Sequence, residues 1–229
     1  MKEEVVQIDL NYNDVKTETI SFKTMGYLFI KRIFDILISI LGCILMLPVA
    51  IIVKISYILS GDYNQVFFCQ DRIGKNGRLF KFYKFRTMVP NADEVLFKML
   101  EEDLEITKEY KINKKIKDDP RITKVGKILR KLSLDELPQM INILLGDMSL
   151  IGNRPYLPRE KEDMEKYYND IIKTKPGLTG YWQVSGRSDI SFNRRLELES
   201  YYSKHCGLKM DIEIFFKTFK VVLFGRGAE

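Results

Sequence analysis

Two adjacent carboxylates, Asp93 and Glu94, follow closely after Lys84 and Arg86, and this combination of residue types is suited to chemistry on a phosphate. A carboxylate can attack phosphorus and form an acyl phosphate, as in ATPases that pass through an aspartyl phosphate. The group attacked is an anion, so basic side chains or a divalent cation must neutralise its charge. The sequence supplies further basic side chains downstream, at Arg121, Arg130 and Lys131.

The same stretch also has the pattern of a helix start. Asn91 and Glu94 are spaced as an N-cap residue and its N3 partner, and acidic residues in a first helical turn gain roughly 0.3–1 kcal/mol each from the helix dipole. Adjacent helical residues point about 100° apart, so the pair need not converge on one atom. The local pattern alone favours the cap, and the basic residues equally suit a solvated face.

Composition narrows the class of protein. The chain has 229 residues, 45% of them hydrophobic and 30% charged, which is typical of a folded domain with a core. The net charge of +6 favours an anionic partner, such as nucleic acid, a phosphorylated substrate or an acidic membrane surface. The three cysteines are far apart and there is one histidine, which argues against a disulfide framework, a zinc site and a serine–histidine triad. The sequence contains neither G-x-G-x-x-G nor G-x-x-x-x-G-K-[ST].

An apolar segment near the N-terminus predicts a membrane helix. The 18 residues 36–53 carry no charge, and as a helix they would reach ~27 Å, slightly short of a ~30 Å hydrocarbon core. Pro48 lies inside the segment and predicts a kink. Basic residues flank both ends, so the positive-inside rule places both ends on the cytoplasmic side. We therefore expect an N-terminal extension (1–25), a re-entrant helix (26–60) and a catalytic domain (61–229), with a buried core helix or a single span as alternatives.

The remaining pattern predicts an α+β, mostly helical domain. Two aromatic runs flank Asn76-Gly77, which is typical of a β-hairpin with a type I′ turn. A helix is expected over about 92–110. Ser133 and Glu136 have the spacing of a capping box that opens another helix, in which Asp135 and Glu136 would serve as braces, and Gly146 ends it. Apolar residues over 212–223 predict an amphipathic helix that packs on the domain or lies at a membrane surface.

Six segments, in this order, resemble the bacterial sugar transferase family, the monotopic phosphoglycosyl transferases that start surface-glycan assembly. They span about 31–226 of the chain with little left over, and the order makes the resemblance specific. The segments are QDRIGKNG (70–77), FKFYKFRTM (80–88), NADE (91–94), DPRIT (119–123), LRKLSLDELPQMINILLGDMSLIGNRP (129–155) and KPGLTGYWQVSGR (175–187).

The resemblance implies a fold and a reaction. A kinked re-entrant helix would be buried in one leaflet, and a small catalytic domain with amphipathic interfacial helices would rest on the cytoplasmic face of the bacterial cell membrane. The enzyme would transfer a sugar-1-phosphate from a UDP-sugar to undecaprenyl phosphate and release UMP, the first membrane step of surface polysaccharide synthesis. Membrane lipid is a further implied partner. A homodimer and downstream glycosyltransferases complete the expected partners, and nucleic acid is not among them.

It also implies residue roles. The family uses an Asp-Glu dyad with Mg²⁺, and the carry-over makes Asp93 the nucleophile that forms a covalent phosphosugar intermediate. Glu94 would hold Mg²⁺ with Asp93 or position it. The expected phosphate and nucleotide contacts are Lys84, Arg86, Arg121, Arg130, Arg154 and Arg187.

Two departures and two alternatives stand beside this interpretation. Leu47 precedes the kinking proline where some members have serine, and Asn153 replaces a proline in the string G-N-R-P. A membrane-anchored hydrolase of nucleotide sugars would share the aspartate chemistry without a lipid acceptor. A membrane-bound nucleic-acid-binding or scaffold protein would explain the charge and the apolar segment, but the sequence shows no nucleic-acid recognition motif.

Overall fold

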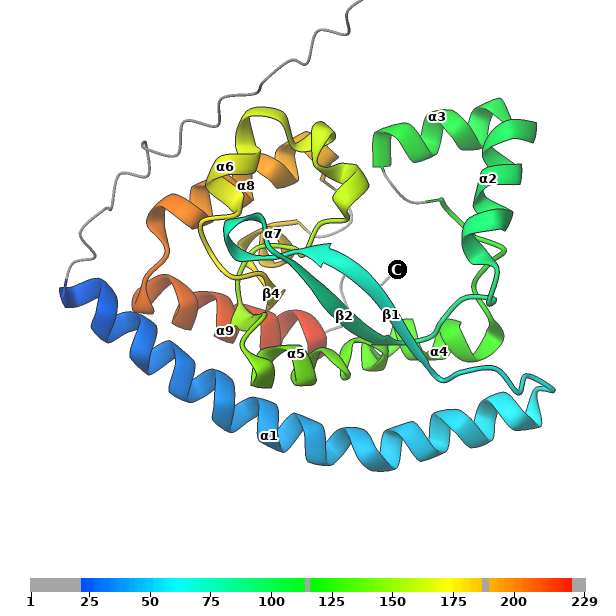
Figure 1. Cartoon of the computed structure of the whole chain (residues 1–229), viewed down its shortest axis with the longest axis horizontal. Coiled ribbons are helices and arrows are strands. Elements are labelled where there is room, and N and C mark those ends of the chain that lie inside the picture. Colours follow the sequence, from blue (N-terminus) through cyan, green and yellow to red (C-terminus); the bar gives the residue numbers. More distant parts are fainter. Residues whose placement is uncertain (1–21, 114–115, 187–189, 224–229) are drawn as a thin grey trace, which may run out of the picture.

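The computed structural model describes residues 22–113, 116–186 and 190–223, and its longest element is helix α1 (Phe22–Leu59). Pro48 lies within this helix. Figure 1 shows α1 as an arc whose concave side faces the rest of the chain. Residues 1–21 of the expected N-terminal extension lie outside the described residues, and the helix begins within that extension, at Phe22.

One stripe of α1 packs against the folded domain, and the opposite stripe is exposed. The buried stripe includes Asp35, Ser39, Met46, Val53 and Tyr57, which recur at intervals of four and seven residues, the spacing of one helix face. Within Met25–Leu59, an 18-residue window has a mean hydropathy of 3.0, and only 22% of that window is buried. Among the described residues, α1 is therefore the one helix long and apolar enough to cross a membrane, and most of its apolar surface is open.

The expected hairpin is confirmed. Strands β1 (Phe67–Ile73) and β2 (Leu79–Phe85) pair antiparallel, from Phe67 opposite Phe85 to Ile73 opposite Leu79. The turn between them contains Asn76 and Gly77 with φ angles of 58° and 77°, which are the left-handed conformations that this dipeptide tolerates. Phe80, Phe82 and Phe85 are buried on the domain, so β2 carries Lys84 along the edge of a core.

Two helical expectations need correction. The helix expected over 92–110 is two helices, α2 (Ala92–Glu102) and α3 (Leu104–Asn113), because Asp103 between them is extended. The capping box at Ser133 does not form. Ser133 has a φ of 54° and makes no side-chain cap hydrogen bond, and the next three residues form a 3₁₀ turn, η2 (Leu134–Glu136). The following helix, α5 (Gln139–Leu145), ends at Gly146 as expected.

The C-terminal half folds back onto the hairpin and α1. Strand β3 (Ser149–Ile151) pairs in parallel with β4 (Gly177–Thr179). The other elements are short except for the last two helices. In chain order they are η3 (Pro158–Glu160), η4 (Glu162–Tyr167), α6 (Tyr168–Ile171), α7 (Tyr181–Val184), α8 (Phe192–His205) and α9 (Leu208–Leu223).

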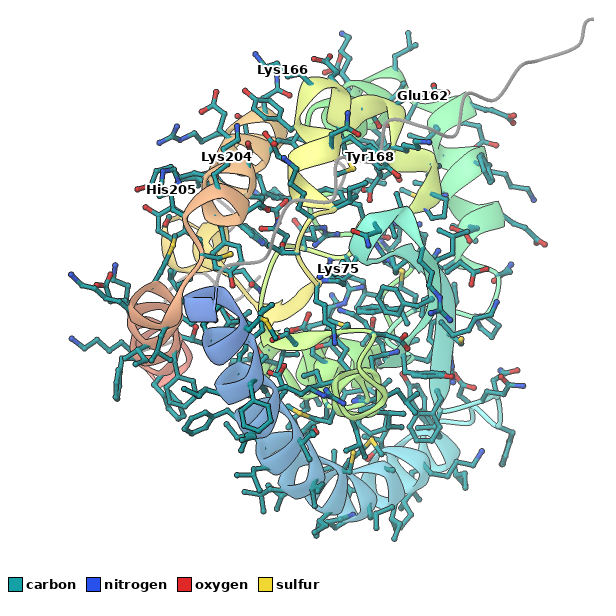
Figure 2. The ribbon with its side chains drawn as sticks, turned by 60° about the vertical axis from the view of Figure 1, so that its left-hand side comes forward. Lys75, Glu162, Lys166, Tyr168, Lys204 and His205 are labelled. Atoms are coloured by element: carbon teal, nitrogen blue, oxygen red, sulfur yellow. The ribbon has the colours of Figure 1, made fainter. Side chains whose placement is uncertain are left out.

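Exposed apolar side chains are concentrated on α1 and continue on α9. Helix α9 buries Ile214 but exposes Leu208, Ile212, Phe216 and Phe219, which gives it the expected amphipathic character. In Figure 2, Glu162 and Lys166 lie at the top of the molecule, and the middle of α1 lies at the bottom.

Candidate active site

A close contact between helix α4 (Lys124–Lys131) and the end of β2 builds the site. Thr123 caps α4 by accepting a hydrogen bond from the Gly126 N–H (2.9 Å), and its own N–H donates to the Thr87 carbonyl (3.0 Å). A Cβ at position 126 would lie 2.0 Å from that carbonyl oxygen, so only glycine permits the approach. One turn later, Arg130 Nε donates to Thr87 Oγ1 (3.1 Å), and the guanidinium is thereby fixed beside β2.

The chain leaves α4 through the left-handed Ser133, and this turn directs a pair of carboxylates at β2. Asp135 is buried, with 7% of its surface exposed, while Glu136 is half-buried. Lys84 Nζ lies 3.3 Å from Asp135 Oδ2 and 3.1 Å from Glu136 Oε1. One ammonium therefore contacts both members of an Asp-Glu pair.

The electrostatics of Asp135 are balanced between burial and basic neighbours. Burial raises the pKa of Asp135 above its usual value, and Glu136 acts in the same direction; Lys84 and Arg130 oppose them. Burial also lowers the pKa of Arg130, which Asp135 and Asp119 oppose. A carboxylate in this position is a stronger base than an exposed one and is shielded from water, and both properties suit an attack on phosphorus.

Asp93 and Glu94 lie elsewhere, in the first turn of α2. Both are exposed, and 62% of the Asp93 side chain is accessible. The Asn91 side chain makes no cap hydrogen bond, so the expected cap is not formed there. Asp93 forms an ion pair with Arg159, with Oδ1 4.0 Å from Nη1. The structure thus does not bring Asp93 or Glu94 into contact with Lys84 or Arg130.

Two of the expected substrate-binding arginines are buried and already paired. Arg121 makes a two-pronged contact with Asp119, with Nε 2.8 Å from Oδ1 and Nη2 2.5 Å from Oδ2. Arg86 donates to Asp62 (2.9 Å) and to the carbonyls of Gln65 and Met88, and it stacks on the Tyr57 ring. These contacts tie the loop after α1 to the end of β2, which is a bracing role.

Arg154 and Arg187 complete the expected set. Arg154 is half-buried, and its backbone N–H donates to Glu199 Oε1 (2.6 Å), while its Nε is buried and has no hydrogen-bond partner among the described residues. Arg187 lies outside the described residues. Of the predicted residues, Lys84 contacts Asp135 and Arg130 lies near it, whereas no contact of Asp93, Glu94 or Arg154 with Asp135 is found among the described residues.

Sequence reasoning assigned Asp135 and Glu136 to bracing and so missed the buried pair. The available signal was that Asp-Glu occurs twice within the six segments, in NADE and in SLDELP. The segment SLDELP also follows directly after Arg130 and Lys131.

The donor atoms at this site suit Mg²⁺. The residues that the structure describes hold no group of three metal-ligating side chains. Mg²⁺, however, is commonly bound through one or two carboxylates together with substrate phosphates and water, and Asp135 and Glu136 supply two adjacent carboxylates. The pair at 93–94 offers the same atoms in an exposed setting.

The family model described as bacterial sugar transferase matches residues 26–225. A Salmonella typhimurium protein named undecaprenyl-phosphate galactose phosphotransferase is 44% identical over 203 residues, which cover 87% of this chain and 42% of that protein. The exopolysaccharide production protein ExoY of Sinorhizobium fredii is 40% identical over 86% of this chain and 87% of its own length. An Aeromonas hydrophila protein named UDP-N-acetylgalactosamine-undecaprenyl-phosphate N-acetylgalactosaminephosphotransferase is 35% identical over 88% of this chain and 45% of its own. The chain thus spans less than half the length of two of these relatives and most of the third.

Proposed function

The chain belongs to the bacterial sugar transferase family, and we propose that it transfers a sugar-1-phosphate from a UDP-sugar to undecaprenyl phosphate, with release of UMP. The product would be the undecaprenyl-diphosphate sugar that begins a surface polysaccharide. The names of the Salmonella and Aeromonas relatives support the lipid acceptor. The observation that carries the proposal is the carboxylate pair of buried Asp135 and half-buried Glu136, which contacts Lys84 and lies near Arg130.

We assign the nucleophile to Asp135 and not to Asp93. Asp135 is buried, contacts an ammonium and lies near a guanidinium, so an anionic phosphate could approach it. Asp93 is exposed, and it pairs with Arg159 at 4.0 Å. An acyl phosphate in an open site would also be lost to water more readily than one in a buried site.

The reaction then has two steps. In the first, an Asp135 carboxylate oxygen bonds to the sugar-linked phosphorus as the bond from that phosphorus to the bridging oxygen breaks, and UMP leaves with the electron pair. In the second, a phosphate oxygen of the lipid attacks the same phosphorus and the bond to Asp135 breaks. Lys84 and Arg130 counter the phosphate charge in both steps. Asp135 and Glu136 would hold Mg²⁺, which supplies further charge neutralisation when bound.

The contacts of α1 support a helix that enters one leaflet and returns. Near its N-terminal end, Tyr27 Oη donates to Asp211 (2.8 Å), and Lys31 forms an ion pair with the same carboxylate. Near its other end, Tyr57 Oη donates to the Arg86 carbonyl (2.5 Å). Both ends of the helix thus contact one folded domain, whereas the two ends of a spanning helix would lie on opposite sides of the bilayer. We therefore propose that the domain rests on the cytoplasmic face of the membrane, because the basic residues at both ends of the apolar segment of α1 favour that side.

The test is UMP release by the purified protein across a panel of UDP-sugars with Mg²⁺, with and without undecaprenyl phosphate. We expect one sugar to give UMP that rises with the lipid, together with a protein adduct of the mass of a sugar phosphate. UMP release that is the same with and without undecaprenyl phosphate would instead indicate a hydrolase. Binding to DNA without turnover of any UDP-sugar would indicate the nucleic-acid-binding alternative.

The topology of α1 has a separate test. Single cysteines placed before Lys31 and after Lys54 should both react with a reagent on the cytoplasmic side, and reaction from opposite sides would exclude the re-entrant helix.

A further inference from the structure

An arginine cluster with too few acidic partners lies beside the proposed catalytic pair. The cluster consists of Arg72 on β1, Arg154 after β3, Arg159 on η3 and Arg195 on α8; Arg154 lies near enough to act on both Arg72 and Arg195, and Arg159 acts on Arg72. Burial lowers the pKa of Arg72 to about 10, and its neighbours Arg154 and Arg159 lower it further. Burial likewise lowers the pKa of Arg195, and Arg154 adds to that effect. Like charges have thus been brought together in a partly dry setting, which costs free energy unless an anion joins them.

The guanidiniums of this cluster have unused donors. Five buried side-chain nitrogens have no hydrogen-bond partner among the described residues, and three of the five are the Nε atoms of Arg72, Arg154 and Arg195. Arg195 is nine-tenths buried. Arg72 donates from its two Nη atoms to the Pro155 carbonyl (3.1 Å) and Gln70 Oε1 (3.0 Å), which leaves only its Nε without a partner. By contrast, the buried Arg121 donates from Nε and Nη2 to Asp119 and from Nη1 to the Ala92 carbonyl. Since buried donors are ordinarily paired, three unpaired ones in a single cluster indicate a missing acceptor.

The acidic residues within the cluster do not fill that role. Glu160 Oε2 accepts from the Leu157 N–H (2.7 Å). Glu199 accepts from the Arg154 N–H (2.6 Å) and from Tyr156 Oη (2.5 Å). Burial raises the pKa of Glu199 to about 7, so it is only partly charged near neutral pH. The cluster therefore retains a net positive charge.

The cluster adjoins the catalytic pair through Phe82. The Arg72 guanidinium lies 5.2 Å from the centre of the Phe82 ring, and Lys84 Nζ lies 5.7 Å from the same point. Lys84 in turn contacts Asp135. Half-buried Arg154 and Trp182 extend the cluster to the surface, and Arg195 stacks on the Trp182 ring at 4.4 Å. Basic side chains thus lie at both Phe82, which adjoins Lys84, and Trp182.

We propose that Arg72, Arg154 and Arg195 bind the uridine monophosphate half of the donor, that is, the leaving group. The inference rests on the proposed function. Displacement at phosphorus proceeds with attacking and leaving oxygens roughly in line, so the leaving nucleotide must occupy a basic surface beyond the reacting phosphate from Asp135. A guanidinium fork matches phosphate oxygens, and the unpaired Nε atoms are donors for them. Trp182 holds the Arg195 plane in place.

The first experiment uses the full chain in nanodiscs of neutral phosphatidylcholine and measures UMP binding without turnover. Trp182 is the one tryptophan of the sequence, so emission excited at 295 nm reports on this cluster alone. We expect a saturable change in emission with UMP, and the same dissociation constant by equilibrium dialysis. UMP that binds by dialysis without changing Trp182 emission would place the nucleotide elsewhere and overturn the proposal. Inorganic phosphate that binds as tightly as UMP would also overturn it, because the site would then recognise any phosphate.

Two neighbouring arginines on α8 provide a matched pair of variants. Arg195→Lys keeps the charge but removes the fork, and Arg72→Lys does the same on β1; each should weaken UMP binding roughly tenfold. Arg194→Lys changes an exposed residue that pairs with Glu197, and UMP binding should be unchanged. Thermal melts establish that each variant is folded. Unaltered UMP affinity in both folded variants would refute the proposal, whereas intact UMP binding in Asp135→Asn separates this site from the catalytic assignment.

Discussion

The dipeptide Asp-Glu occurs twice in the chain, at 93–94 and at 135–136, and the two pairs lie in contrasting surroundings. The first opens α2, where both side chains face solvent and Asp93 lies 4.0 Å from an arginine on η3. The second lies in the η2 turn, where Asp135 is buried and Lys84 contacts both carboxylates. Packing thus gives the same dipeptide two different environments. Burial and basic neighbours act on the pKa of Asp135 and limit the access of water to it.

The largest expected effect separates the two pairs directly. Asp135→Asn should lower sugar-phosphate transfer by at least about 10³-fold, since an amide cannot form the acyl phosphate. Asp93→Asn, at an exposed position, should remain within about tenfold of the wild type, because exposed charge contacts are weak. UMP release and intact-mass detection of the phosphosugar adduct measure both variants. The reverse pattern would return the nucleophile to Asp93.

The second test removes the basic partner of the buried pair. Lys84→Gln should lower kcat/KM roughly 10²-fold, because one charge-neutralising group is lost from a site of low dielectric. Lys81→Gln is the matched control on the same strand, since Lys81 is 63% exposed and pairs with Asp71 at the surface. Steady-state kinetics with the preferred UDP-sugar compare the two. An equal fall in kcat/KM in both variants would show that the contact between Lys84 and Asp135 does not contribute specifically to transfer.

The third test acts on the packing that creates the contrast. Gly126→Ala would place a methyl group 2.0 Å from the Thr87 carbonyl, so α4 and β2 must separate and Arg130 must move. We expect a loss of at least about 2 kcal/mol of folding free energy, with a fall in transfer activity. Gly207→Ala is the control, because no atom lies within 4 Å of its added Cβ. Thermal melts in nanodiscs compare the variants, and a wild-type melt for Gly126→Ala would contradict the packing argument.

Sequence patterns predicted the elements that depend on local conformation. The hairpin followed from Asn76-Gly77, the end of α5 from Gly146, and the amphipathic α9 from its periodicity. Each of these features depends on residues that adopt a left-handed backbone angle or on a periodic apolar pattern, and both can be recognised in the sequence. The long apolar helix followed in the same way from an uncharged run.

The site depended on distant contacts and was predicted less well. Whether Arg130 binds substrate or braces depends on Thr87, 43 residues away, and the burial of Asp135 depends on Lys84 from another element. Ser133 resembled a cap, but its backbone is left-handed and its side chain makes no cap hydrogen bond. Arg121 was assigned to substrate, although Asp119 only two residues earlier occupies it. The resemblance supplied an Asp-Glu dyad, and only the three-dimensional contacts distinguish the two pairs.

The smallest expected effect extends the comparison to Glu199, a carboxylate more buried than either pair. Its pKa of about 7 in the folded chain lies above the usual 4.5, so folding favours its protonated form. The contribution of Glu199 to stability is therefore fully present below pH 4.5, declines as the pH rises towards 7 and is lost above it. The charged and titratable groups that face it are Arg154, Arg195 and Tyr156.

We expect Glu199→Gln to flatten the pH dependence of stability between about pH 5 and 8 by on the order of 1–3 kcal/mol, since the amide keeps the shape and cannot ionise. Asp93→Asn, which makes the same acid-to-amide change at an exposed position, is the control variant. Melting temperatures across this range, for the wild type and both variants, measure the difference. A wild type that becomes more stable from pH 5 to 8, with Glu199→Gln following the same curve, would show that burial does not govern this carboxylate. Because burial also raises the pKa of Asp135, that result would count against Asp135 as the nucleophile as well.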